Sequence, residues 1–296
     1  MDRTIKAHIA LFIANLIYGA NYTIAKEAMP DYIMPFGFIL LRVTGAFILF
    51  WGVHAFMPKE KVELRDIFRL AICGVFGVAI NQLLFFKGLS ITTPINAAII
   101  MTINPVMVLL FAAIIIKDSI NPRKVIGIVT GLLGAVFLIT NSGEFSFSNQ
   151  TSIGDGFVFI NATSYGLYLV LVKPLMNKYS PFTIIKWVFL FGFIYVLPFG
   201  LEEALLVNWE AMPFKIFCAI GFVVVFTTFF AYLLNILALK ELSPSIVSYY
   251  IYLQPILASL IALSFEKDII TFEKGIAALF IFLGVFLISS NSKKTI

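Results

Sequence analysis

The chain has 296 residues, of which 60% are hydrophobic and 12% are charged, and its mean hydropathy is +0.99. A soluble domain carries roughly 25% charged residues, so this composition excludes a soluble fold and predicts a protein whose main partner is the lipid bilayer. The net charge of +5 does not indicate nucleic-acid binding, because the Lys and Arg residues lie between apolar runs and form no basic stripe.

The apolar runs are long and unalternated, which favours membrane-spanning helices of about 20 residues over the strands of a barrel. We therefore predict an all-α polytopic membrane protein with ten transmembrane helices. The predicted helices lie at residues 7–26, 33–56, 67–89, 94–116, 123–140, 154–173, 182–200, 213–238, 245–265 and 272–290.

One pattern in the first half of the chain recurs in the second half. Pro94 matches Pro244 and Pro105 matches Pro255, each at an offset of 150 residues. The first helices of the halves match at a slightly shorter offset of 147, which pairs Tyr18 with Tyr165. Such spacing predicts one duplicated unit.

The two copies are expected over residues 1–145 and 150–296. Each holds five predicted helices, an odd number, so the second copy must cross the membrane in the opposite direction, as in carriers built from inverted repeats. Fifteen Lys and Arg residues fall on one side of the membrane and five on the other, while Arg42 lies within a helix. Because positive residues concentrate in the cytoplasm, we expect both termini there.

Polar side chains within the predicted helices mark the faces turned away from lipid. On the first helix Asn15, Tyr18 and Tyr22 share one face, and on the sixth Asn161 and Tyr165 do the same. A single Asn could serve only an interhelical hydrogen bond, but six helices contributing together favour a cavity. The candidate cavity residues are Asn15, Tyr18, Asn21, Tyr22, Arg42, Asn81, Gln82, Asn96, Asn104, Tyr165, Tyr168, Tyr232, Asn235, Tyr249 and Gln254.

Arg42 lies about nine residues into the second helix, too deep for an incidental charge. Lys26 and Lys87 are expected in the same outer half, so the three could form a contact for a carboxylate or a phosphate. The alternative is that Arg42 bonds backbone carbonyls or extends toward the membrane surface.

Pro105 and Pro255 each fall near the middle of a predicted helix, where proline removes a backbone donor. The carbonyls of Met101 and Ile251, four residues back, should then lack their usual partner. We interpret the two prolines as symmetric helix breaks beside the cavity, with a packed structural kink as the alternative.

The chain shows no sign of enzyme chemistry. It contains no His-Glu-x-x-His metal motif and no glycine-loop nucleotide motif, so we expect no catalytic residue, no metal and no cofactor.

Small residues recur in the fifth and tenth predicted helices, at Gly127, Gly131 and Gly134 and at Gly275 and Gly284. Such spacing allows close helix packing, either within the chain or in a homodimer.

The arrangement of ten helices in two halves, each with a proline-broken fourth helix and a glycine-rich fifth, resembles the EamA family of the drug/metabolite transporter superfamily. The residues that carry the resemblance are Ala97–Gly134 in the first half and Ala231-Tyr232, Ala238-Leu239, Ser243-Pro244, Gln254-Pro255 and Gly284 in the second. The resemblance implies an integral inner-membrane carrier with a central cavity, and members of the family export amino acids or metabolites.

We therefore expect a secondary transporter, in the bacterial plasma membrane, that exports a small polar metabolite such as an amino acid by alternating access. The alternative within transport is a carrier of sugar phosphates or other organic anions. Outside transport, the chain could be a membrane scaffold subunit or a membrane enzyme.

Overall fold

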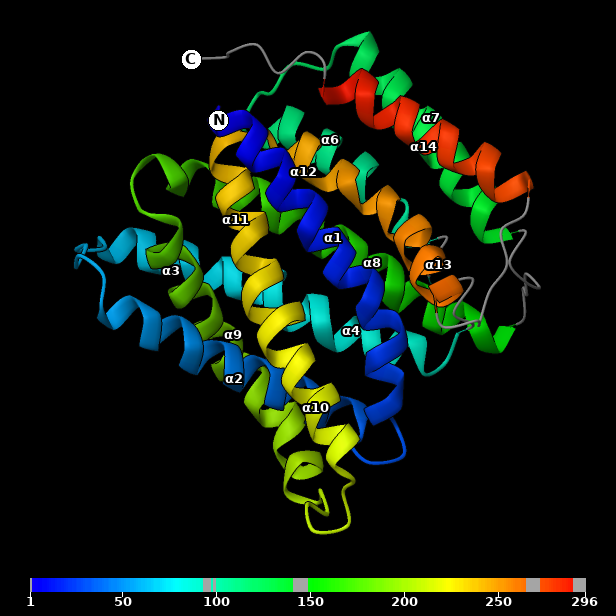
Figure 1. Ribbon diagram of the computed structural model, residues 1–296. Helices are drawn as coiled ribbons and strands as arrows, with labels where there is room; N and C mark the ends of the chain where they lie inside the picture. Colours follow the sequence, from blue (N-terminus) through cyan, green and yellow to red (C-terminus); the bar gives the residue numbers. More distant parts are fainter. Residues whose placement is uncertain (1, 93–96, 98–99, 141–148, 265–271, 290–296) are drawn as a thin grey trace.

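The computed structural model describes all residues except 1, 93–96, 98–99, 141–148, 265–271 and 290–296. The described part is built of helices and contains no strand (Figure 1). The elements are α1 (Arg3–Ala28), α2 (Pro35–Ala55), α3 (Leu64–Gly74), η1 (Val75–Ala79), α4 (Ile80–Leu89), α6 (Asn104–Ile115), α7 (Pro122–Thr140), α8 (Asn149–Val172), η2 (Lys173–Asn177), α9 (Pro181–Leu205), α10 (Phe214–Phe222), η3 (Val223–Phe230), α11 (Ala231–Glu241), α12 (Pro244–Tyr249), η4 (Tyr250–Leu253), α13 (Gln254–Ser264) and α14 (Phe272–Ser289).

Within the described residues, five helical segments are long and apolar enough to cross a bilayer. They are Pro35–Ala55, Leu64–Leu89, Ser152–Asn177, Pro181–Leu205 and Phe214–Glu241. Asn104–Ile115 and Gly275–Leu287 are shorter apolar helices. The prediction of an all-helical fold with membrane-length apolar helices is confirmed, and the full number of ten spans stays a prediction. Pro94 and Asn96 lie outside the described residues.

Helices from the two halves of the chain pack against each other reciprocally. α2 packs along α9, and α7 along α14 (Figure 1). α1 contacts α11 and α13 of the second half, while α8, the first helix of that half, contacts α4 and α6 of the first. Reciprocal contacts of this kind arise when two similar units are related by a two-fold axis.

Two hydrogen bonds join residues that lie 150 positions apart, the repeat offset. The Gln82 Nε2 donates to the Tyr232 hydroxyl at 3.3 Å, and the Tyr252 hydroxyl donates to the Thr102 carbonyl oxygen at 3.0 Å. A residue that contacts its own counterpart lies on the axis that relates the two units. Both bonds are of the kind that an approximate two-fold axis would produce, one between α4 and α11 and the other between the segments that precede α6 and α13.

The two prolines begin new helical segments instead of kinking continuous helices. Each occupies one of the first positions of its helix, Pro105 in α6 and Pro255 in α13, where the missing N–H costs no intrahelical bond. A turn precedes α6, and the 3-10 segment η4 precedes α13. The Ile251 carbonyl, which we expected to lack a partner, accepts a hydrogen bond from the Gln254 N–H, because the tighter 3-10 turn moves the bond to the third residue.

Tyr249 inserts its hydroxyl between α7 and α14, which pack against each other. The hydroxyl donates to the Gly127 carbonyl at 2.8 Å. A Cβ atom at Gly131 would lie 2.0 Å from this hydroxyl, and one at Gly284 only 1.7 Å from it. These glycines therefore serve a close contact within one chain, and a homodimer stays a prediction.

An ionic cluster joins the halves at the start of α3. The Asp66 side chain is fully buried, with one carboxylate oxygen 2.8 Å from the Lys178 Nζ and 2.9 Å from the donating Tyr179 hydroxyl. The Arg69 guanidinium reaches the other oxygen at 3.0 Å. The hydrogen bond from Lys178 to Asp66 raises the pKa of this lysine above its usual value. The cluster connects the segment before α9 to the first half.

The short distance between Gly284 and the Tyr249 hydroxyl allows a prediction about stability. Gly284→Ala should lower the free energy of unfolding by about 1–3 kcal/mol, the usual cost of adding a methyl group to a filled space. Gly275→Ala on the same helix is the matched control, because nothing lies within 4 Å of the added atom. SDS titration in mixed micelles measures the free energy of unfolding of both variants. Equal stability of the two would contradict the close contact between Gly284 and the Tyr249 hydroxyl.

Candidate binding cavity

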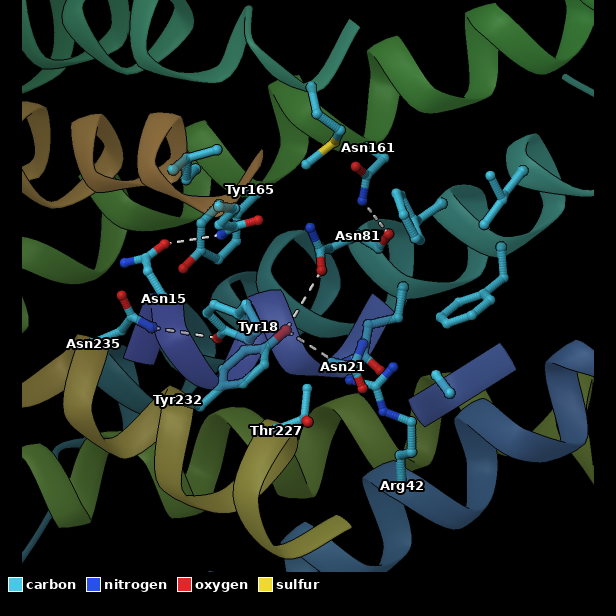
Figure 2. A pocket seen from close by; sticks show the side chains of 18 of the residues that line it. Asn15, Tyr18, Asn21, Arg42, Asn81, Asn161, Tyr165, Thr227, Tyr232 and Asn235 are labelled. Atoms are coloured by element: carbon cyan, nitrogen blue, oxygen red, sulfur yellow. Dashed lines mark hydrogen bonds between the residues drawn. The ribbon is translucent and has the colours of Figure 1, made fainter. Parts of the chain in front are cut away.

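A cavity of about 190 Å³ lies between the two halves, lined by α1, α2, α4, α8, η3, α11 and the broken helices around Met101 and Ile251 (Figure 2). Its wall combines polar side chains with apolar ones such as Met29, Phe85 and Leu89. Ten of the fifteen candidate residues line it: Asn15, Tyr18, Asn21, Arg42, Asn81, Gln82, Tyr165, Tyr232, Asn235 and Gln254.

Three candidate residues lie outside this cavity because they serve other contacts. Asn104 is fully buried, and its Nδ2 donates to the Ala162 carbonyl at 2.6 Å. Tyr249 reaches the α7–α14 pair, as described above. Tyr168 is 2% exposed, and its ring packs against the backbone of Gly77.

The remaining candidates lie outside the described part of the chain or, in one case, on its exposed surface. Asn96 lies outside the described residues, as do the side chains of Tyr22 and Lys26. Lys87 is exposed and does not line the cavity. Of the three residues predicted to contact an anion, Arg42 is therefore the one that lines the cavity in the described part of the chain.

The polar lining residues bond to one another across the two halves (Figure 2). Tyr232 of α11 accepts from the Gln82 Nε2, and its hydroxyl donates to the Asn81 Oδ1 at 3.5 Å. The Asn161 Nδ2 of α8 donates to the Asn81 carbonyl. This chain of bonds holds the side chains of α4 in place against the second half.

A second group of bonds fixes the face of α1. The Asn235 Nδ2 donates to the Tyr18 hydroxyl at 3.3 Å, and the Gln254 Nε2 donates to the Asn15 Oδ1 at 3.0 Å. Asn15 in turn donates to the Leu11 carbonyl one turn earlier, at 2.7 Å. Both bonds between helices cross from the first half to the second.

Arg42 extends from α2 toward the cavity (Figure 2) and is 6% exposed. Its Nε donates to the Thr228 Oγ1 at 3.2 Å, and Thr228 donates to the Val223 carbonyl within the π-helical segment η3. Its guanidinium carbon lies 5.8 Å from the centre of the Phe86 ring. Among the described residues, no carboxylate lies within ion-pair distance of Arg42, and no Asp or Glu lines the cavity.

Four lining residues carry a buried oxygen atom without a hydrogen-bond partner. Three are amide oxygens, Asn21 Oδ1, Gln82 Oε1 and Asn161 Oδ1, and the fourth is the Thr227 hydroxyl. Buried polar atoms usually have a partner, but such atoms are not confined to the cavity, because His54 Nδ1 and the Tyr168 hydroxyl, which do not line it, are also buried without one. Asn161 and Thr227 were not among the candidates. The sequence analysis placed Asn161 with Tyr165 on the polar face of the sixth helix without counting it as a candidate, whereas the apolar run around Thr227 offered no signal.

Comparisons with known proteins agree with this architecture. The EamA-like transporter family matches residues 5–140 and again residues 152–290. The chain is 26% identical over 286 residues to an uncharacterized transporter, YyaM, of Bacillus subtilis, covering 95% of this chain and 93% of that one. It is 21% identical over 193 residues to a probable terminal-alkyne amino-acid exporter of Streptantibioticus cattleyicolor, covering 65% and 63% of the two chains.

A solved crystal structure has the same fold. It superposes with a TM-score of 0.81 and covers 97% of both chains at 17% sequence identity. This agreement concerns the fold alone. The relatives carry the names of transporters and not of enzymes, which removes the enzyme alternative.

The burial of Arg42 without a carboxylate partner among the described residues allows a prediction about stability. An unpaired arginine inside a membrane helix costs about 3 kcal/mol on insertion scales, so Arg42→Gln should leave the unfolding temperature of the purified protein unchanged or raise it. Lys178→Gln, which deprives the buried Asp66 of its lysine, should lower it. A clear loss of thermal stability in Arg42→Gln alone would mean that Arg42 serves the fold.

Proposed function

Because the chain belongs to the EamA-like transporter family, within the drug/metabolite transporter superfamily, we propose that it is a secondary transporter that exports a small polar metabolite by alternating access. The observation that carries the proposal is the polar cavity between the two halves, whose lining includes buried polar atoms without partners. A scaffold subunit would have no use for a cavity of this kind between its halves, lined by Arg42 and by Asn, Gln and Tyr side chains.

The proposed architecture is ten transmembrane helices in two inverted five-helix repeats, over residues 1–145 and 150–296. The family matches the chain twice, at 5–140 and 152–290. The reciprocal packing of the halves and the two bonds between residues 150 apart support an approximate two-fold axis. We place the protein in the bacterial inner membrane with both termini in the cytoplasm, on the strength of the charge distribution.

The cavity lining differs between the halves, and this difference supports alternating access. On α1 and α4 the lining extends toward the helix ends, at Met29 and Leu89, which are partly exposed. Their counterparts at the repeat offsets, Met176 and Leu239, are 4% and 0% exposed. With the termini in the cytoplasm, the cavity opens outward, and the buried counterparts mark the closed cytoplasmic side.

In the other state of the cycle, the two halves should exchange these roles. The cytoplasmic side would open around Met176 and Leu239, and the outer side would close around Met29 and Leu89. The Asp66 cluster, which ties the segment before α9 to α3 in this state, would then have to separate.

For the substrate, amino acids are the favoured class and organic anions such as sugar phosphates the alternative. The relative named as a probable amino-acid exporter supports the first. Arg42 is buried and has no acidic partner in the described part of the chain, which favours a substrate with an anionic group and is compatible with either class.

Cysteine labelling tests alternating access without knowledge of the substrate. In a background without Cys73 and Cys218, a membrane-impermeant maleimide applied outside should label Met29→Cys and Leu89→Cys. The same reagent applied from the cytoplasmic side of inverted vesicles should label Met176→Cys and Leu239→Cys. The residue types match within each pair, so position alone differs between test and control.

Crosslinking provides the second half of this test. Locking the outer side closed, by a disulfide across the cavity mouth, should raise the labelling rate of Met176→Cys severalfold. If Met176→Cys and Leu239→Cys stay unlabelled in every condition while Met29→Cys reacts, the cavity is a fixed pocket and the proposal fails.

A further inference from the structure

The segment that joins α2 to α3, residues 56–69, directs its acidic side chains toward the second half of the protein. It lies at the left of Figure 1 and contains three carboxylates. Each is held by a residue just before α9: Glu60 by the Ser180 N–H at 2.9 Å, and Glu63 and Asp66 by the Lys178 Nζ at 3.5 Å and 2.8 Å. These acids are therefore not available to balance the basic residues of the segment.

The basic side chains of the same segment are on the surface. Lys59, Lys61 and Arg65 are exposed, and none of them forms an ion pair with a described residue. Large apolar side chains are exposed beside them, with Phe56 92% and Leu64 83% exposed. Exposed apolar groups next to unpaired basic ones are typical of a segment at the membrane surface, among anionic head groups. In the orientation proposed above, this is the cytoplasmic surface.

A buried lysine lies nearby, at the seam between α2 and α9. Lys186 is 8% exposed, and its Nζ lies 5.1 Å and 5.8 Å from the centres of the Trp51 and Trp187 rings. The Trp51 Nε1 donates to the Lys186 carbonyl at 3.2 Å, which holds this ring beside the lysine. Among the described residues, no carboxylate lies within ion-pair distance of the Lys186 Nζ. Glu60 interacts with it electrostatically, but its carboxylate binds the start of α9.

The indole rings do not replace a counter-ion for Lys186. A buried lysine is usually paired with an anion, and the face of an aromatic ring attracts a cation less strongly than a charged oxygen does. Trp51 is 36% exposed, and nothing lies within 4 Å of a Cβ atom placed on the adjoining Gly52. The surface at the seam is therefore open to the bilayer. None of these residues lines the central cavity, so an anion at the seam would bind outside it.

The surrounding side chains favour a lipid over a soluble anion. The acyl chains of a lipid with its head group at Lys186 would cover the exposed apolar surface of Trp51 and Phe56, which inorganic phosphate would leave uncovered. Lys59 and Lys61 flank Glu60 in the sequence and add positive charge at the level of the head groups. This charge favours a head group that is net negative over a zwitterionic one.

We propose that the seam between α2 and α9 binds an anionic phospholipid of the cytoplasmic leaflet, with its phosphate on Lys186 and its head group near Lys59 and Lys61. Because α2 and α9 come from different halves of the chain, the bound lipid joins the two halves at a place outside the cavity. The inference goes beyond the proposed transport function and requires neither a substrate nor a conformational cycle.

Lipid titration tests this site on the purified full-length protein in detergent. Thermal unfolding is followed while dioleoylphosphatidylglycerol or dioleoylphosphatidylcholine is added, so that the acyl chains are the same and the head-group charge differs. Half-saturation should need at least about fivefold less of the anionic lipid, the difference expected from one basic contact. Inorganic phosphate at millimolar concentration should not raise the unfolding temperature.

Variants locate the site. Lys186→Gln should need at least about fivefold more of the anionic lipid and the same amount of the zwitterionic one, whereas Lys186→Arg should keep the preference. Because Lys186 is buried and its loss also affects folding, the double variant Lys59→Gln/Lys61→Gln, whose side chains are exposed and unpaired, gives a second test and should also lose preference. Lys6→Gln is the matched control. It removes an exposed charge at the start of α1, on the same predicted side of the membrane, and should bind as the wild type does.

Several results would overturn the inference. Equal affinity of the wild type for the two lipids would exclude an anionic lipid site. A full preference for the anionic lipid in folded Lys186→Gln, or in the double variant, would show that the seam does not bind it. An equal loss in Lys6→Gln would indicate attraction to the overall positive charge. Stabilisation by inorganic phosphate as large as that by the anionic lipid would assign the seam to a soluble anion.

Discussion

Polar side chains inside a membrane must find their partners within the protein, because lipid offers none. In this chain several of the partners at the cavity come from the opposite half. Tyr18 bonds to Asn235, Gln82 bonds to Tyr232, and Asn161 bonds to Asn81. The same bonds that satisfy these groups therefore also hold the two halves together, and the cavity lies at the contact that must change if the halves move.

Backbone irregularities lie next to these bonds. The π-helical segment η1 precedes Asn81 and Gln82 on α4, and η3 precedes Tyr232 on α11 and includes Thr227 and Thr228. An extra residue in a helical turn displaces backbone bonds, which is common at functional sites. In η3 the displaced carbonyl of Val223 accepts from Thr228, and Thr228 in turn accepts from Arg42. The irregular turn thus contributes to positioning the charged residue of the cavity.

The one charged residue that lines the cavity in the described part of the chain has no charged counterpart in the other half. Arg42 lies seven residues after Pro35, the first residue of α2, and the same position after Pro181 in α9 is the buried Val188. The charge is therefore present in one half alone. Gln82 and Tyr232, which lie 150 positions apart, both line the cavity, whereas Arg42 lines it without a charged equivalent in the other half.

The sequence by itself predicted the helical membrane fold, the family and ten of the polar residues that line the cavity. Apolar runs of membrane length leave few alternatives to helices, and polar residues repeated on one helical face, such as Asn15 and Tyr18, must avoid lipid. Only the tertiary structure decided which polar residues share the cavity. Tyr168 and Tyr165 are one turn apart on α8, yet Tyr168 packs on Gly77 while Tyr165 lines the cavity, because the neighbouring helices divide that face between them. Tyr249 reaches α7 and α14 for the same reason. A helical period tells which side chains point inward, whereas the contacts they make there depend on helices distant in sequence.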